Sequence, residues 1–87
     1  MSFSVQWQES AENELAQIWI DAEDRSLITA TADQIDKLLV NDPESLGESR
    51  GGSNRILIER PLAVLYRVEK DQRILVLKIT YSPRRKR

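Results

Sequence analysis

The chain has 87 residues, and at this length we expect a single domain covering residues 1–87. Hydrophobic residues make up 40% and charged residues 31% of the sequence, with three Gly and three Pro, which is typical of a globular protein rather than a disordered one. The sequence contains no Cys and no His, which excludes disulfides, thiol nucleophiles and histidine bases. We therefore expect neither a metal ion nor another cofactor.

The sequence also bears on location and on charge. No apolar run approaches the roughly 20 residues that span a bilayer, so we expect a cytoplasmic protein without a membrane partner. Residues 1–44 contain 10 acidic and 2 basic residues, a net charge of −8, whereas residues 45–87 contain 4 acidic and 11 basic residues, a net charge of +7. The basic half predicts contact with a polyanion or an acidic partner. The alternative is that acidic helices and a basic sheet neutralise each other within one fold.

The first half of the sequence predicts a strand followed by two helices. Residues 3–7 alternate large apolar and polar side chains, which indicates a strand with one buried face. Ser10 then has a side chain suited to the N-cap of the first helix. Asp42-Pro43 ends the second helix, because the proline ring disfavours a helical conformation at the residue before it. The apolar positions with helical spacing are Ala11, Leu15, Ile18, Trp19 and Ala22 in the first helix, and Leu27, Ile28, Thr31, Ile35, Leu38 and Leu39 in the second.

The second half predicts a loop and three strands. Residues 46–54 are rich in Gly, Ser and charge, which indicates a loop. Segments 55–59, 62–68 and 73–81 have strand composition, and turn residues separate them. The predicted fold class is therefore α+β: an N-terminal strand, a helical hairpin and a three-stranded antiparallel meander (β-α-α-β-β-β) in two layers, with the helices on one face of the sheet.

The pairing of the last two strands decides which side chains face the helices. A four-residue turn at 69–72 would place Val68 opposite Arg73, and therefore Tyr66 opposite Leu75 and Lys78 opposite Ala63. This register predicts a helix-facing set of Leu62, Val64, Tyr66, Leu75, Leu77 and Ile79, and an open face with Ala63, Leu65, Arg67, Ile74, Val76 and Lys78. The open face is mixed and basic, and a tail with four consecutive cations, residues 84–87, follows the last strand.

Six short motifs occur in one order along the chain. They are Phe-x-Val-x-Trp at 3–7, Ala-x-x-Glu-Leu at 11–15, Asp-Pro at 42–43, Gly-Glu-x-Arg at 47–50, Val-Leu-Tyr-Arg-Val at 64–68 and Ile-Leu-Val-Leu at 74–77. With this order, the length and the basic second half, the sequence resembles the RelE/ParE superfamily of toxins of bacterial type II toxin-antitoxin systems, also described as a plasmid-stabilisation family. The resemblance covers nearly all of the chain and implies a RelE-like fold and a cognate antitoxin as partner.

The resemblance implies one of two activities. RelE-like toxins enter the ribosome and cleave mRNA there, with Arg and Lys side chains stabilising phosphate charge, so the ribosome and mRNA would be partners. Such cleavage needs aligned reactants and cations on the phosphate, which this chain could supply without histidine. ParE-like toxins instead inhibit DNA gyrase and are not enzymes. The leading expectation is a toxin that blocks translation by mRNA cleavage, and the alternative is a gyrase inhibitor or a catalytically silent relic that binds an antitoxin.

Part of the expected catalytic set is present. By the resemblance, Arg55 matches a basic position of RelE-like sites and Arg84 matches an arginine implicated in their catalysis. Leu57 and Ala63 stand where two further basic residues are expected, and no tyrosine follows Tyr81.

The missing groups could have substitutes nearby. Lys78, Arg67 and Tyr81 are the candidates, and Arg85, Lys86 and Arg87 are candidate phosphate-binding residues. The alternative for each of these cations is an ordinary solvated position on a strand or tail. A free-standing RNA-binding module is a third possibility, but the predicted open face lacks the aromatic side chains on which bases stack.

Overall fold

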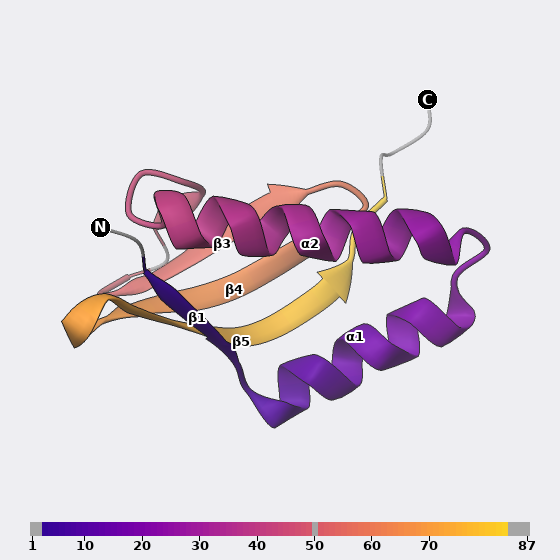
Figure 1. The fold of residues 1–87 in the computed structure, drawn as a ribbon, viewed down its shortest axis with the longest axis horizontal. Helices are drawn as coiled ribbons and strands as arrows, with labels where there is room; N and C mark the ends of the chain where they lie inside the picture. Colours follow the sequence, from indigo (N-terminus) through magenta and orange to yellow (C-terminus); the bar gives the residue numbers. More distant parts are fainter. Residues whose placement is uncertain (1–2, 50, 84–87) are drawn as a thin grey trace.

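A computed structural model describes residues 3–49 and 51–83. Its elements are β1 (Ser4–Trp7), α1 (Glu9–Asp21), α2 (Arg25–Asn41), β2 (Glu48–Ser49), β3 (Asn54–Glu59), β4 (Leu62–Glu69), the 3₁₀ turn η1 (Lys70–Gln72) and β5 (Arg73–Tyr81). The strands form one mixed sheet in the order β1-β5-β4-β3-β2, and the two helices lie on one side of it (Figure 1). The predicted α+β fold is confirmed. None of the described helices is long and apolar enough to cross a membrane.

The helix boundaries depend on local capping groups. The N-cap of α1 is Gln8, whose side chain makes no capping hydrogen bond, so the predicted cap at Ser10 is wrong and Ser10 lies inside the first turn. The N-cap of α2 is Asp24, whose carboxylate accepts the Leu27 N–H at 3.1 Å. This bond starts α2 two residues before the predicted apolar pattern. The helix ends just before Asp42, as predicted.

The predicted loop 46–54 contains a short strand. Glu48 and Ser49 of β2 pair antiparallel with Ile56 and Arg55 of β3, which extends the sheet by one strand. Gly47 allows this approach, because its φ is +67° and a Cβ at this position would lie 2.0 Å from the Ile56 carbonyl oxygen. Two residues are too few to show a strand period, so the sequence pattern does not reveal β2.

The predicted register of β4 and β5 is wrong. Glu69 rather than Val68 lies opposite Arg73, because the connection is the three-residue turn η1. Asp71 and Gln72 adopt left-handed backbone with φ of +66° and +58°, which closes the turn one residue earlier than a four-residue loop. All pairs next to the turn are therefore shifted by one residue.

A bulge shifts the register once more. The pairing changes between Tyr66, which lies opposite Val76, and Leu65, which lies opposite Lys78, so Leu77 is the additional residue on β5. Ala63 lies opposite Thr80, not opposite Lys78 as predicted. A bulge has no signature in an all-apolar run such as residues 74–77, and the strand alternation alone could not locate it.

The corrected register exchanges the two faces of β5 over residues 74–77 only. Beyond the bulge the total shift is two residues, so Ile79 enters the core and Lys78 stays exposed, as predicted. The side chains that enter the core are Ile74, Val76 and Ile79, whereas the predicted Leu75 and Leu77 are only partly buried. The predicted β4 residues face the core as expected. The core cluster consists of Ala11, Ile28, Ile35, Leu39, Leu57, Leu62, Val64, Tyr66, Ile74, Val76 and Ile79. Trp19, which the helical spacing assigned to the core, keeps 41% of its surface exposed.

Candidate functional site

The face of the sheet opposite the helices carries aliphatic side chains with cations around them. Along each strand, the residues that alternate with the buried ones point to this face. They include Ile56, Ile58, Ala63, Leu65, Arg67, Leu75 and Lys78. The side chain of Ile58 is 49% exposed, and no helix of the described chain covers this face (Figure 1). We call these seven residues the open sheet face. Partly exposed aliphatic side chains therefore lie beside the cations Arg67 and Lys78 on this face.

Two of the predicted site residues, Arg67 and Lys78, lie on the open sheet face. Arg67 donates from Nε to Asn54 Oδ1 at 3.2 Å, and its Nη1 lies 3.8 Å from Glu69 Oε2. Lys78 lies opposite Leu65, two positions along β4 from Arg67. The two cations are therefore neighbours on adjacent strands. Both side chains remain about half exposed, at 45% and 56%.

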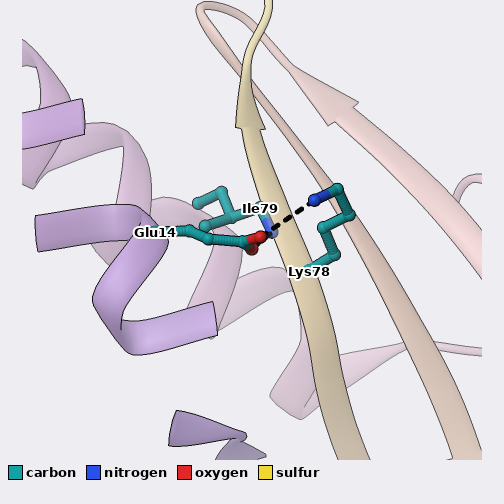
Figure 2. A network of polar contacts seen from close by, with 3 residues as sticks. All are labelled: Glu14, Lys78 and Ile79. Atoms are coloured by element: carbon teal, nitrogen blue, oxygen red, sulfur yellow. Dashed lines mark hydrogen bonds and ion pairs between the residues drawn. The ribbon is translucent and has the colours of Figure 1, made fainter. Parts of the chain in front are cut away.

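Lys78 is already paired with a helix residue. Its Nζ lies 2.8 Å from Glu14 Oε2, and the other carboxylate oxygen of Glu14 accepts the Ile79 backbone N–H at 3.0 Å (Figure 2). The hydrogen bond from Lys78 and then the one from Ile79 hold the pKa of Glu14 below its ordinary value. Glu14 thus draws the Lys78 ammonium toward α1. Glu14 is not among the apolar positions of the first helix, and nothing in the helical spacing indicates a contact with Lys78.

Arg55 lies on the opposite side of the sheet. It pairs with the core residue Tyr66 across β3 and β4, so both side chains point to the helix side. Its Nε donates to the Leu46 carbonyl at 2.8 Å and its Nη2 to the Gly47 carbonyl at 3.2 Å. Arg55 therefore holds the segment before β2 in place, and the sheet separates it from Arg67.

Tyr66 binds the same segment as Arg55, through the Leu46 carbonyl. Its side chain is fully buried, and its Oη lies 2.7 Å from the Pro43 carbonyl oxygen and 2.9 Å from the Leu46 carbonyl oxygen. Burial raises the pKa of Tyr66, and the neighbouring Arg55 partly offsets that rise. A buried phenol with a raised pKa and two carbonyl partners fixes the end of α2 relative to the sheet, which is a structural role.

Tyr81 lies at the far end of β5. The Tyr81 side chain is 56% exposed and lines a groove between this end of β5 and the α1–α2 connection, away from Arg67. Arg60 fixes the exit of the strand, because its Nη1 donates to the Ser82 and Pro83 carbonyls at 3.0 and 3.2 Å. The sequence indicated only a turn at Arg60. The predicted Arg84, Arg85, Lys86 and Arg87 lie outside the described residues.

Solved structures share this fold over nearly its whole length. A chain of the toxin-antitoxin complex RelBE2 from Mycobacterium tuberculosis matches with a TM-score of 0.74 and 14% identity, covering 93% of this chain and 92% of the other. A chain of the chromosomal ParDE toxin-antitoxin system of Pseudomonas aeruginosa matches with a TM-score of 0.70 and 21% identity, covering 91% and 95%. TrmO from Pseudomonas aeruginosa matches with a TM-score of 0.64 and 19% identity, but only 33% of its chain is covered.

No protein-family model and no curated protein matches the sequence. At these identities the matches define the fold alone. The chain therefore has the RelE-like fold, and its resemblance to the RelE/ParE superfamily is confirmed at the level of the fold.

Proposed function

We propose that this protein is the toxin of a toxin-antitoxin pair and is held inactive by a cognate antitoxin in the cytoplasm. The observation that carries this proposal is the match over more than nine tenths of both chains to chains from the RelBE2 and ParDE toxin-antitoxin complexes. The matching TrmO chain is about three times as long as the matched region, so it offers a weaker guide to the activity of a chain of this size.

The open sheet face is the surface that suits an antitoxin. It combines partly exposed aliphatic residues with Arg67 and Lys78, so an acidic or amphipathic segment could bury apolar area and pair with charge there. The basic tail, residues 84–87, would add attraction at longer range. Deleting that tail should weaken antitoxin binding and reduce its dependence on salt, and unchanged binding would remove the tail from the interface.

The arrangement of the cations favours a toxin that acts by binding, as a gyrase inhibitor would. Arg55 donates to two loop carbonyls on the helix side, and Lys78 is paired with Glu14, so the three predicted cations that the structure describes do not converge on one point. Loss of a single donor that stabilises charge in the transition state commonly costs about 10²–10³-fold in rate. With Leu57 and Ala63 also replacing basic groups, a strong phosphate-cleaving site is hard to assemble from the described residues.

Ribosome-dependent mRNA cleavage is the second candidate. It is supported by the proximity of Arg67 and Lys78 on an uncovered face, where a phosphate could contact both cations if Lys78 left Glu14. The ribosome would supply the catalytic groups that this chain lacks. The basic tail could contact RNA phosphates without reading the base sequence.

Two assays on the purified chain separate these activities. The first adds the protein to a bacterial cell-free translation reaction and maps mRNA ends by primer extension, with and without ribosomes. The second measures supercoiling by DNA gyrase. Inhibited supercoiling with intact mRNA is the expected result, and cuts that need ribosomes would instead establish the second candidate. If both assays are negative and expression of the chain does not slow bacterial growth, the toxin proposal is wrong.

The variant Arg67→Ala tests whether the open sheet face carries the activity. Lys70→Ala is the matched control, because it removes an exposed cation from the turn η1 rather than from the sheet face. Activity should fall with Arg67→Ala and not with Lys70→Ala. Equal activity of both variants would place the functional surface elsewhere.

A further inference from the structure

β1 covers only the first part of one edge of β5. Its residues pair in parallel with Arg73 to Val76, and the Gln8 N–H then donates to the Val76 carbonyl at 3.0 Å before the chain enters α1. The other edge of β5 is paired with β4 along its length. Within the described chain, the outer edge of β5 from Leu77 to Tyr81 therefore has no neighbouring strand.

The side chain of Glu14 already binds one backbone N–H group of that edge, the N–H of Ile79. Glu14 accepts the Ile79 N–H, which shows that this N–H points away from β4 and toward α1 (Figure 2). In a strand the backbone groups of every second residue point to the same edge, so those of Tyr81 point there too. Such an edge is a template for an added strand.

An apolar groove of about 660 Å³ runs beside this edge. Ile18 of α1, Ala22 just after it, Leu27 of α2, and Tyr81 contribute apolar surface to it. Leu27 and Tyr81 are 47% and 56% exposed, although both are large side chains. The groove can therefore take the inward-pointing side chains of an added strand, while its outward-pointing side chains stay in water.

The groove has one sign of charge. Glu14, Asp21, Glu23 and Asp24 line it, and no described Lys or Arg side chain does. Because Glu14 is paired with Lys78, the remaining three carboxylates set the local field. A partner that carries several Lys or Arg residues would be attracted to this groove, and an acidic partner would be repelled.

From these observations we infer that the Leu77–Tyr81 edge and its acidic groove are a strand-addition site for an extended basic peptide segment of another protein. The segment has apolar residues at alternate positions, which enter the groove, and Lys or Arg residues between them. It continues the sheet in line with β1. This surface lies on the helix side of the sheet, apart from the open sheet face, so the inference does not depend on the proposed function.

The test is a titration of the whole ¹⁵N-labelled chain with the peptide acetyl-Lys-Val-Lys-Val-Lys-Val-Lys-amide, followed by amide chemical shifts. The expected result is saturable shifts confined to Leu77–Tyr81 and the facing end of α1. A version N-methylated on alternate backbone nitrogens keeps the side chains but loses backbone donors. It should bind at least about tenfold more weakly, because two hydrogen bonds are lost. The same peptide with Glu in place of Lys should not bind.

Two charge variants test the role of the acidic groove, one inside it and one outside it as a control. In Glu23→Lys the groove loses one exposed carboxylate, and affinity for the lysine peptide should fall several-fold and depend less on salt. In Glu44→Lys an exposed carboxylate that does not line the groove is changed in the same way, and affinity should stay the same.

Three outcomes would overturn the inference. Equal binding of the N-methylated peptide would show that no strand is added, and shifts centred on Trp19 and Ile20 would place the peptide in a different groove, between α1 and α2. Concentration-dependent broadening of the Leu77–Tyr81 amides without peptide would identify a second copy of this chain as the occupant.

Discussion

Glu14 of α1 joins the helical layer to β5 through both of its carboxylate oxygens: one accepts the Ile79 N–H at 3.0 Å, and the other lies 2.8 Å from Lys78 Nζ. Consecutive strand residues are thus bound by one side chain, Ile79 through its backbone and Lys78 through its ammonium. The contact fixes the position of α1 along β5, beyond the point at which β1 ends.

Stability should depend on the charge of Glu14 at acidic pH. Because its pKa is lowered in the folded protein, the carboxylate contributes stability above its unfolded value near 4.5, and this contribution is lost as the pH falls through the folded value. Urea unfolding of the wild type and of Glu14→Gln between pH 3 and pH 7 measures the effect. The wild type should be more stable near neutral pH, and the difference should shrink below about pH 4.5. A difference that is constant across this range would contradict the assigned role.

Removal of the Tyr66 hydroxyl should destabilise the fold. Tyr66→Phe removes the single phenol proton that the Pro43 and Leu46 carbonyls share at a buried position, and only the Leu46 carbonyl keeps a bond from Arg55 Nε. We expect a cost of about 1–2 kcal/mol in the free energy of unfolding. Tyr81→Phe is the control, because that phenol is 56% exposed and its loss should change stability by less than about 0.5 kcal/mol. Chemical denaturation checks both values, and equal stability of the two variants would refute the anchoring role of Tyr66.

The close approach of Gly47 to β3 predicts a strong effect of a single methyl group. Gly47→Ala combines a left-handed φ of +67° with a Cβ placed 2.0 Å from the Ile56 carbonyl oxygen, and we expect a loss of about 3 kcal/mol or more. Gly52→Ala has a similar φ of +55° with nothing within 4 Å, so it should lose only about 1 kcal/mol. Thermal unfolding distinguishes the two variants. Similar melting temperatures would show that backbone strain alone, and not the close contact with Ile56, sets the loss of stability at both positions.

Arg55 and Arg67 should differ in what their removal affects. Arg55→Ala removes hydrogen bonds to the Leu46 and Gly47 carbonyls, so it should lower stability by about 1–3 kcal/mol. Arg67→Ala changes a half-exposed side chain on the open sheet face and should stay within about 0.5 kcal/mol of the wild type. Growth arrest on expression, compared at equal amounts of folded protein, should then be reduced by Arg67→Ala. A loss of growth arrest only in Arg55→Ala at matched folded protein would restore Arg55 as a site residue.

The order of the elements other than β2 could be predicted from the sequence, because their signals are local. Alternation at residues 3–7, helical spacing through Leu39 and the Asp42-Pro43 stop each act within a few residues, and β1, α1 and α2 formed close to the predicted ranges. The assignment of Tyr66 to the core followed from alternation along one strand in the same way.

Which residues contact each other depends instead on the turn, the bulge and the sheet pairing. Residues 74–77 are all apolar, so alternation could not choose between the faces, and the left-handed turn at Asp71 and the bulge at Leu77 set the register of β5. Sheet pairing also decides on which face each predicted cation lies. Arg55 and Arg67 occupy opposite faces because a strand turns successive side chains to opposite sides, and the sheet pairing of β3 with β4 then places Arg55 beside Tyr66 and the loop carbonyls. The attraction of Glu14 for Lys78 spans 64 residues of chain, a distance over which no sequence period carries information.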